Sequence, residues 1–285
     1  MNQTALIDIV VVACDSGVLL EDCVARALDS AECASLTLVD NASSDGYPQR
    51  LAERFAHDPR FRLLAMARNV GFGAGCNRGA ERGQAGQVLL LNPDCLIARD
   101  SLSGLLAVLS ADRRIGLLGA DVRDALGREE RAARRRDPTP ERLLADHGRA
   151  LGLRGEGVQI ARSVEDVQSV DACSGALMLL PRAVWQRVGG FDPQFFLHGE
   201  DLDLCRRVRL AGFRVAVANR VQVVHRQGSS SRARPLFVAW HKHLGLARYL
   251  LRYQAQGLGP RLFIIAGIAV MFLLRGLPRA LTRKS

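Results

Sequence analysis

The amino-acid sequence predicts an α/β protein with a parallel sheet and a helical extension at its C-terminal end. Three observations support this prediction. Short apolar runs that are typical of buried strands alternate with amphipathic helical segments over roughly the first 90 residues. Polar residues follow several of these runs directly, where open α/β sheets bind their ligands. A second apolar segment, bounded by arginines near the C-terminus, fits neither pattern.

Composition and charge limit the class of protein. The chain has 285 residues, enough for one large α/β domain or two small ones. Apolar residues make up 48% and charged residues 24%, which is ordinary for a globular chain and excludes a disordered one. A formal net charge of +10 is typical of proteins that bind nucleic acid or an anionic membrane surface. Because aromatic residues are only 5% and no nucleic-acid-binding pattern occurs, we expect no nucleic-acid partner.

The cysteines and the start of the chain indicate a cytoplasmic protein. The seven cysteines are odd in number and are never spaced C-x-x-C. They therefore predict neither a zinc site nor a disulfide framework, and a reducing compartment fits them best. Met1–Thr4 leads into a strand without a basic region and a cleavage site, so it does not resemble a signal peptide.

The first half of the chain predicts four strands with helices between them. The strands are expected over 6–13, 35–39, 61–65 and 88–91, and the helices over 17–27, 48–55 and the end of the glycine-rich segment 68–79. Pro93 stops the fourth strand because proline cannot donate to a ladder. Asp94 is therefore expected just past the carboxyl end of that strand.

The second half predicts a less regular pattern. Helices are expected over 102–109, 182–188 and 200–211, and strands over 115–118, 170–180 with a break at 174–175, 213–218 and 221–225. Residues 128–165 are charged and rich in arginine. We expect them to form an irregular excursion over the active face.

The tail from residue 235 is predicted to be helical, with weak breaks at Gly257 and Pro260. Residues 262–274 are apolar on all sides, but as a helix they span roughly 20 Å, short of the ~30 Å hydrocarbon core of a bilayer. A buried helix or an oligomer contact, such as that of a homodimer, is one interpretation. We favour a helix at an anionic membrane surface, assisted by Arg248, Arg252, Arg279, Arg283 and Lys284.

Carboxylates open the helix predicted to begin at Glu200. Successive helical residues turn by about 100°, and one apolar face carries Leu204, Cys205, Val208 and Ala211. Asp201 falls in the middle of that face and Asp203 outside it. Burial and like charges raise a carboxyl pKa and make it a better general base, whereas the helix N-terminus opposes this. The alternative, an acidic helix start that offsets the macrodipole, explains Glu200 and Asp203 better than Asp201.

Asp40, Asp94 and His225 each lie at the end of a predicted strand. A carboxylate such as Asp94 is costly to desolvate unless a cation meets it, and a hard metal that holds a diphosphate is the candidate. The alternative is an Asn-Pro-Asp turn that caps the next helix. Asp40 is expected either to bind a nucleotide base or to organise the turn over 40–46. His225 is either an ordinary packed histidine or a further metal ligand beside Asp94.

Two glycine segments are suited to close approach by a ligand. Residues 68–79 offer backbone amides at a helix N-terminus, although they do not form a G-x-G-x-x-G fingerprint after a first strand. Gly189–Asp192 is most simply a turn. Its backbone freedom would also let an acceptor sugar approach, with Phe191 as an apolar face.

Five motifs in this order make the sequence resemble the inverting family-2 glycosyltransferases, and among them the bacterial rhamnosyltransferases: LTLVDNASSDG, RNVGFGAGCNRGA, LLLNPDC, GGFDPQFFLHGEDLDLCRRVRLAGFRV and VVHRQGSS. The resemblance covers about Leu6–Ser231. It implies a GT-A fold, with a Rossmann-like nucleotide-binding half and a mixed central sheet, over 1–231. The helical tail over 232–285 would serve membrane association or oligomerisation.

The resemblance also implies an activity. The enzyme would bind Mg²⁺ or Mn²⁺ and move a sugar from a nucleoside diphosphate, with inversion, to a hydroxyl of a glycan or polyprenyl-diphosphate-linked acceptor. This step would belong to cell-surface polysaccharide synthesis at the inner face of the membrane. The best candidate for the donor is dTDP-L-rhamnose, with a UDP-sugar as the alternative.

The resemblance assigns roles by position. Asp201 would be the general base, Asp94 would bind metal and diphosphate, and His225 would be a further metal or phosphate ligand. The residues on the nucleotide and donor side would be Ala13, Asp15, Asp40, Asn41, Arg68, Asn69, Gly71, Asn77 and Asn92. The residues on the acceptor side would be Gly190, Phe191, Asp192 and Glu200. Asp94 and Asp201 are then expected to converge across a cleft that holds the donor.

Two departures from the family pattern affect these expectations. Many relatives carry Asp-x-Asp where this chain has Asn92, so the metal would depend more on Asp94 and would bind more weakly. The first strand usually ends in Thr-Tyr-Asn, which is Ala13-Cys14-Asp15 here, and this changes the nucleotide-stacking contact. A sugar nucleotidyltransferase is disfavoured because no early G-x-G-T-R-type loop occurs. A protein that binds a sugar nucleotide without catalysis remains an alternative, because Asn92 replaces an acidic residue of the family pattern.

Overall fold

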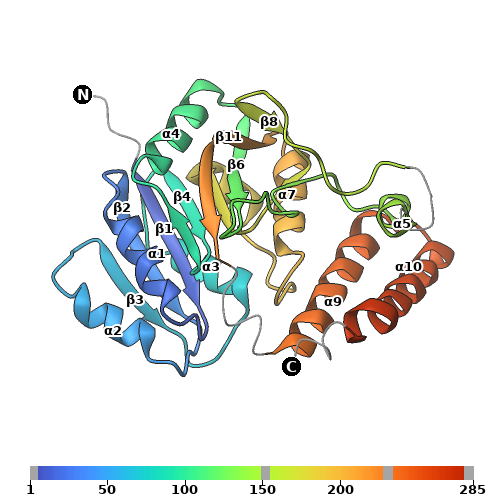
Figure 1. The fold of residues 1–285 in the computed structure, drawn as a ribbon, viewed down its shortest axis with the longest axis horizontal. Helices are drawn as coiled ribbons and strands as arrows, with labels where there is room; N and C mark the ends of the chain where they lie inside the picture. Colours follow the sequence, from blue (N-terminus) through green and yellow to red (C-terminus); the bar gives the residue numbers. More distant parts are fainter. Residues whose placement is uncertain (1–5, 149–154, 227–233, 279–285) are drawn as a thin grey trace.

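The computed structural model describes residues 6–148, 155–226 and 234–278 (Figure 1). Its first half contains β1 (Ile7–Ala13), α1 (Leu19–Leu28), β2 (Cys33–Asp40), α2 (Tyr47–Arg54), β3 (Phe61–Ala65), α3 (Phe72–Ala80), β4 (Gln87–Leu91), β5 (Cys95–Ile97), α4 (Ser101–Ala111) and β6 (Ile115–Arg123). There follow β7 (Arg134–Arg135), α5 (Pro140–Gly148), β8 (Val167–Ser169), β9 (Ala172–Cys173), β10 (Leu177–Pro181), α6 (Arg182–Val188), α7 (Glu200–Leu210) and β11 (Arg214–His225). The chain closes with α9 (Pro235–Tyr253), α10 (Leu258–Met271) and a π-helical turn (Phe272–Gly276).

A nine-stranded mixed sheet forms the centre, in the order β3-β2-β1-β4-β10-β6-β11-β5, with β8 also paired to β11. β1 to β4 pair in parallel, β10 runs antiparallel to both β4 and β6, and β6 is parallel to β11. The predicted α/β fold with a mixed central sheet is therefore confirmed. Because β1, β2, β4, β6 and β11 run in one direction, their carboxyl ends share one edge of the sheet.

Alternation along the strands builds a core on each face of the sheet. Ile9, Val11 and Leu89 pack with α1 and α4 on one face, whereas Val10 and Leu90 pack with α3, α6 and α7 on the other. A strand buried on both faces reads as a continuous apolar run, which is why these strands were predictable.

The prediction of an irregular excursion over 128–165 is wrong in part. Residues 134–135 form β7, which pairs with β9, and α5 covers 140–148. Arg134 is only 1% exposed. Arg134 and Arg135 form ion pairs with Asp121 and Asp201, whereas Arg128 and Arg131 of the same run are exposed. A charged composition alone cannot reveal which arginines are paired in this way. The two strands predicted over 213–225 are one strand, β11, with an irregularity between Ala218 and Gln222.

The C-terminal helices lie side by side at one end of the molecule, and α9 packs against α7 (Figure 1). Asp203 of α7 is fully buried and accepts hydrogen bonds from Arg252 at 2.9 Å and from the hydroxyl of Tyr253 at 2.8 Å. The expectation that Asp203 lies outside the buried face of its helix is therefore wrong. The reason is that α9, and not the sheet, covers that side.

Among the described residues, no helix is both long and apolar enough to cross a bilayer. Several sequence predictions lie outside the described residues: Met1–Thr4, the end of the VVHRQGSS motif from Gln227, the division between residues 231 and 232, and Arg279, Arg283 and Lys284.

Candidate active site

Asp94 and His225 lie side by side at the carboxyl edge of the sheet. The short strand β5 pairs antiparallel with the end of β11 and sets Cys95 opposite His225. Nε2 of His225 then lies 3.0 Å from Oδ1 of Asp94, and Nδ1 lies 2.7 Å from Oε1 of Glu130. Burial lowers the pKa of His225, but the hydrogen bonds to Asp94 and Glu130 outweigh it and raise that pKa to about 10.

The donor atoms of this cluster fit a divalent cation. Asp94, Cys95 and His225 each have a donor atom within 4.8 Å of the others. Cys95 stays a thiol, because burial raises its pKa and its Sγ donates to the carbonyl of Ala176. The carboxylate and the imidazole remain. Carboxylate oxygens are typical ligands of Mg²⁺ and Mn²⁺, whereas an imidazole nitrogen suits a transition-metal ion such as Mn²⁺ better than Mg²⁺. At neutral pH the raised pKa keeps both ring nitrogens protonated, with Nε2–H facing Asp94 and Nδ1–H facing Glu130. A bound cation would take the place of the Nε2 proton, while Nδ1–H would stay on Glu130.

Glu200 and Asp201 open α7 and have opposite electrostatic surroundings. Burial raises the pKa of Asp201, but the Arg135 guanidinium, 2.6 Å from its Oδ2, outweighs burial and holds that pKa below its ordinary value. Burial, followed by the charge of Asp201, raises the pKa of Glu200 to about 8. Oε2 of Glu200 is buried without a hydrogen-bond partner among the described residues. The pKa that is raised is thus that of Glu200 and not that of Asp201, because Arg135 pairs with Asp201. The sequence could not show this, since nothing in it points to Arg135.

The turn before β10, at Gly175 and Ala176, lies near both the strand end that leads to Asp94 and the Asp201 side chain. Leu177 of β10 pairs with Leu91, and the carbonyl of Ala176 accepts a hydrogen bond from the amide of Asn92 at 2.9 Å. A Cβ atom on Gly175 would lie 3.4 Å from Cβ of Asp201. One glycine turn therefore lies beside the Asp201 side chain and is hydrogen-bonded to the strand end that leads to Asp94.

The nucleotide-side residues form a hydrogen-bonded rim along β1, β2 and the glycine segment. Nδ2 of Asn41 donates to Oδ1 of Asn69 at 2.9 Å, and Oδ1 of Asn41 accepts from the amide of Val70 at 2.9 Å. Gly71 has φ +90°, and a Cβ there would lie 2.5 Å from the carbonyl oxygen of Phe196. Arg68 is exposed. Asn41 therefore ties the second strand end to the glycine segment.

Asp40 and Asp15 shape the turn over 40–46. Oδ1 of Asp40 accepts from the amide of Ser43 at 2.8 Å, and its Oδ2 accepts from Gln49 at 2.9 Å. These contacts match the turn-organising alternative for Asp40. Oδ1 of Asp15, which has φ +51°, accepts from the amide of Ser44 at 2.7 Å.

The end of β1 lies beside this rim. The carbonyl of Ala13 accepts a hydrogen bond from the amide of Asn41 at 2.8 Å. The side-chain amide of Asn69 lies 3.2 Å from Sγ of Cys14. The side-chain amide nitrogen of Asn92 lies 3.5 Å from Nε2 of His225, so Asn92 borders the metal cluster as well.

Two residues predicted to meet ligands are used by the core. Phe191 is 1% exposed and packs edge-on against Trp185, so its ring does not offer a face to an acceptor. Both ends of the Asn77 amide bind the backbone of Phe191, each at 2.8 Å. Gly190 has φ +65°, and Asp192 forms an ion pair with Arg252 at 2.6 Å. The bulky apolar neighbours of Phe191 explain its burial.

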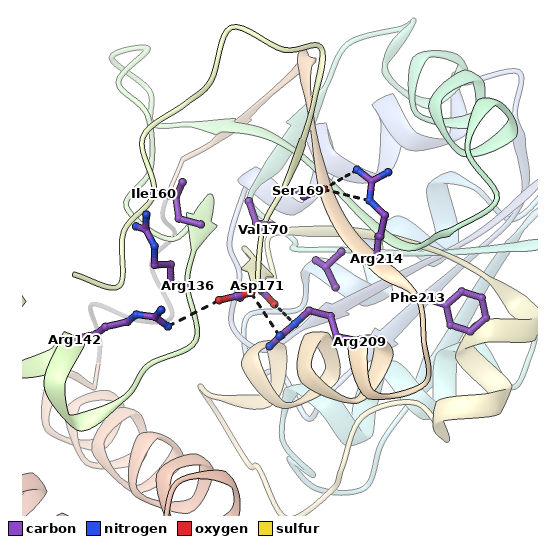
Figure 2. A pocket seen from close by; sticks show the side chains of 10 residues that line it. Arg136, Arg142, Ile160, Ser169, Val170, Asp171, Arg209, Phe213 and Arg214 are labelled. Carbon is purple, nitrogen blue, oxygen red and sulfur yellow. Dashed lines mark hydrogen bonds and ion pairs between the residues drawn. The ribbon is translucent and has the colours of Figure 1, made fainter. Parts of the chain in front are cut away.

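A hollow of about 450 Å³ lies at the other end of α7 from Asp201 (Figure 2). Arg136, Arg142, Arg209 and Arg214 line it together with Asp171. Its arginines are already paired: Arg209 lies 3.5 Å from Asp171, and Arg214 lies 2.5 Å from Asp112. The carboxylates and the histidine at the sheet edge, and not this hollow, therefore form the candidate site.

Glu130 and Arg135 are the site residues that the sequence did not reveal. Both fall in an arginine-rich run whose composition favours a solvated surface. No spacing rule separates them from their exposed neighbours.

Comparison with known proteins identifies similar chains. Residues 5–238 match the family model described as glycosyltransferase like family 2. The N-acetylglucosaminyl-diphospho-decaprenol L-rhamnosyltransferase of Mycobacterium tuberculosis strain H37Rv is 29% identical over 90% of this chain and 91% of its own length. The rhamnosyltransferase WbbL of Escherichia coli strain K12 is 28% identical over 48% of this chain and 51% of its own length.

Solved structures share the fold at low sequence identity. The mannosyltransferase PcManGT from Pyrobaculum calidifontis, in complex with GDP-Man and Mn²⁺, has a TM-score of 0.61 and 18% identity, covering 97% of this chain and 73% of its own. S. aureus TarS 1–349 in complex with UDP-GlcNAc has a TM-score of 0.59 and 14% identity, covering 94% of this chain and 72% of its own. GalNAc-T7 with UDP, GalNAc and Mn²⁺ has a TM-score of 0.61 and 15% identity, over 95% of this chain and 57% of its own.

Proposed function

This chain belongs to the glycosyltransferase-like family 2, and from that premise we propose that it transfers a sugar from a nucleoside diphosphate to an acceptor hydroxyl with inversion. The single observation that supports this most is the Gly175 turn. It lies against Asp201 on one side and against the strand end that leads to Asp94 on the other. A donor held there would have a cation-binding group and a carboxylate base at its two ends.

The carboxylate of Asp201 is the proposed general base. Its ion pair with Arg135 keeps it ionised at neutral pH, so it can accept the proton of the attacking hydroxyl. The hydroxyl oxygen forms a bond to the anomeric carbon as the bond to the diphosphate breaks on the opposite face. The proton ends on Oδ of Asp201 and the electron pair on the diphosphate. A single displacement inverts the anomeric configuration and needs no covalent intermediate.

Asp94 and His225 would hold Mg²⁺ or Mn²⁺ against the diphosphate. When bound, such a cation offsets the negative charge that develops on the leaving group. The similar structures of GalNAc-T7 and PcManGT were solved with Mn²⁺, which supports this assignment. Asn92, near His225, replaces the first acidic residue of the family pattern, and we therefore propose modest metal affinity.

The proposed donor is dTDP-L-rhamnose, and the proposed acceptor is N-acetylglucosamine on a polyprenyl diphosphate. The name of the mycobacterial relative, which aligns over nine tenths of this chain, supports both. A UDP-sugar is the second candidate, since TarS binds UDP-GlcNAc within the same fold. The reaction would then add a sugar to a lipid-linked precursor of a cell-surface polysaccharide.

Helix α10 is the proposed contact with the inner face of an anionic membrane. Its described apolar side chains are mostly exposed, including Leu258 at 72%, Leu262 at 57% and Phe263 at 61%. Arg261 lies exposed among them, and the chain carries a net charge of +10, which complements anionic headgroups. A lipid surface would thus cover the helix and bring the site to a lipid-linked acceptor. A homodimer is the alternative cover for the same helix.

A panel of nucleotide sugars tests the proposed function. Purified protein is mixed with dTDP-L-rhamnose, UDP-GlcNAc, UDP-glucose or GDP-mannose, with and without a synthetic N-acetylglucosaminyl polyprenyl diphosphate. Release of nucleoside diphosphate is followed in Mn²⁺, in Mg²⁺ and in EDTA. We expect acceptor-dependent release that is strongest with dTDP-L-rhamnose and lost in EDTA. Release of pyrophosphate from a nucleoside triphosphate would instead indicate a nucleotidyltransferase, and no release from any donor would contradict the proposal.

A further inference from the structure

Residues 129–135, which we name the bridge segment, are anchored at the centre of the molecule by one buried arginine. The side chain of Arg134 has no exposed surface and lies 2.9 Å from Asp121, itself fully buried. It also donates to Oδ1 of Asn219 at 3.1 Å and to Oε1 of Glu129 at 2.5 Å. A buried guanidinium is stable only with such partners, and their loss is costly. The backbone of the bridge segment is therefore fixed between β6 and β9.

The neighbours of this anchor reach the two halves of the candidate site. Glu130 accepts the hydrogen bond from Nδ1 of His225 at 2.7 Å, and its side chain is 7% exposed. Arg135 donates from Nη2 to Oδ2 of Asp201 at 2.6 Å and to the carbonyl of Cys173 at 2.5 Å. One short segment thus contacts the proposed metal ligand and the proposed base.

We propose that the bridge segment sets the distance and orientation between the metal-binding and proton-accepting groups, with Glu130 and Arg135 as positioning residues. This inference rests on the proposed function of the site. Glu130 fixes the ring of His225 and leaves Nε2 directed to Asp94. Arg135 holds Oδ2 of Asp201, so the other carboxylate oxygen and the charge of the base keep a defined place. Arg134 holds both Glu130 and Arg135 in place, because it fixes the backbone of the segment that contains them.

The surroundings of Asp201 define what loss of Arg135 does. The titratable groups against Asp201 are Arg135 on β7, Glu200 and His198 on its own segment, and the buried Cys173. Burial lowers the pKa of His198 to about 4, so this ring is neutral at working pH. Without Arg135, burial of Asp201 favours the protonated carboxyl, and the amide of Leu202, which donates to Oδ1 of Asp201 at 2.8 Å, is the remaining contact that favours the carboxylate. The pKa of Asp201 should therefore rise.

The Arg135 arm is tested by the pH dependence of kcat/KM. In Arg135→Met the acid limb is expected to move to higher pH by about one unit or more, since an opposite charge at this range lowers a carboxyl pKa by about that amount. Arg135→Lys keeps a positive charge and should restore much of the limb. Arg135→Lys also provides the test if Arg135→Met does not fold, because its acid limb can then be compared with that of the wild type alone. An acid limb unchanged in both variants would overturn this arm.

The Glu130 arm is tested without activity, by the Mn²⁺ affinity that electron paramagnetic resonance measures. Glu130→Ala is expected to weaken Mn²⁺ binding by about 10-fold to 100-fold, as is typical when the partner of a metal-bound histidine is removed. Glu130→Gln keeps a hydrogen-bond acceptor and should fall between. Wild-type affinity in both variants would overturn this arm.

Arg136 and Glu156 supply matched controls. Arg136 directly follows the bridge segment and forms an ion pair with Glu156 at 3.3 Å, and the Glu156 side chain is 71% exposed. Arg136→Met and Glu156→Gln should leave both the acid limb and the Mn²⁺ affinity as in the wild type. A control that shifts either property as much as its partner variant would show a general charge effect and overturn the inference. If the wild type releases no nucleoside diphosphate, the proposed function fails, whereas the Mn²⁺ measurements still decide the Glu130 arm.

Discussion

Oδ1 of Asp94 and Nε2 of His225 lie 3.0 Å apart, although 131 positions separate them in the chain. The pairing of β5 with the end of β11 produces this contact, because it sets the residue after Asp94 opposite His225. A three-residue strand thus creates the end of the site that we propose binds a cation. The other end, Asp201, depends on the start of α7 and on its ion pair with Arg135.

Replacement of the proposed base separates chemistry from donor binding. Asp201→Asn should lower kcat by about 10²-fold to 10⁴-fold, the usual contribution of general base catalysis. Donor affinity, measured by calorimetry with dTDP-L-rhamnose and Mn²⁺, should change little, because the proposed contact of Asp201 is with the acceptor hydroxyl. The control is Asp166→Asn, which removes a carboxylate from an exposed ion pair with Arg220. Turnover that is the same in both variants would remove Asp201 from the role of base.

Cys14 offers a chemical probe of the nucleotide rim. Among the free cysteines it is the one that is partly exposed, whereas the others are buried. Burial and the neighbouring Asp15 raise its pKa, so a maleimide should react slowly, at one site, at mildly alkaline pH. We expect dTDP or UDP with Mn²⁺ to slow this reaction, because the thiol lies beside Asn69 at the strand end. Mass spectrometry measures the labelling, and Cys14→Ser is its blank. A labelling rate that no nucleotide changes would show that the nucleotide base binds away from Cys14.

Asp203 is expected to stabilise the fold and not the transition state. Asp203→Asn removes a fully buried charge that Arg207 and Arg252 contact at 2.7 and 2.9 Å. It should lower the free energy of unfolding by about 3 kcal/mol, since breaking a buried pair leaves charge uncompensated. Tyr253→Phe should cost about 1 kcal/mol. Urea denaturation measures both, and the exposed Asp166→Asn change should stay within about 0.5 kcal/mol. Equal losses for Asp203→Asn and Asp166→Asn would contradict this role.

These cases show which parts of the fold and site a sequence can predict. The strands β1 and β4 were predictable because burial on both faces leaves an uninterrupted apolar run. Asp94 and His225 were found as strand-end residues, but their contact depends on β5, which is too short to leave a period. Asp203 was misplaced because a distant helix covers it. Arg135 and Glu130 were missed because a buried arginine and an exposed one have the same sequence pattern until their partners are known.

Helix α10 provides the test of membrane contact. Phe263→Glu with Leu262→Glu introduces charge into the exposed apolar surface and should abolish co-sedimentation with vesicles that contain phosphatidylglycerol. Binding of the wild type should weaken on vesicles of phosphatidylcholine alone and at high salt. The matched control is Leu126→Glu, at a residue that is 75% exposed in a turn far along the chain. Absence of vesicle binding by the wild type, together with a dimer in light scattering that the double variant dissociates, would favour the homodimer instead.

The most direct measurement is a crystal structure of the protein with Mn²⁺ and an unreactive analogue of dTDP-L-rhamnose. We expect Mn²⁺ on Asp94 and His225, the diphosphate against it, and the anomeric carbon on the side of Asp201. A diphosphate bound in the arginine-lined hollow at the far end of α7, or an anomeric carbon turned away from Asp201, would contradict it.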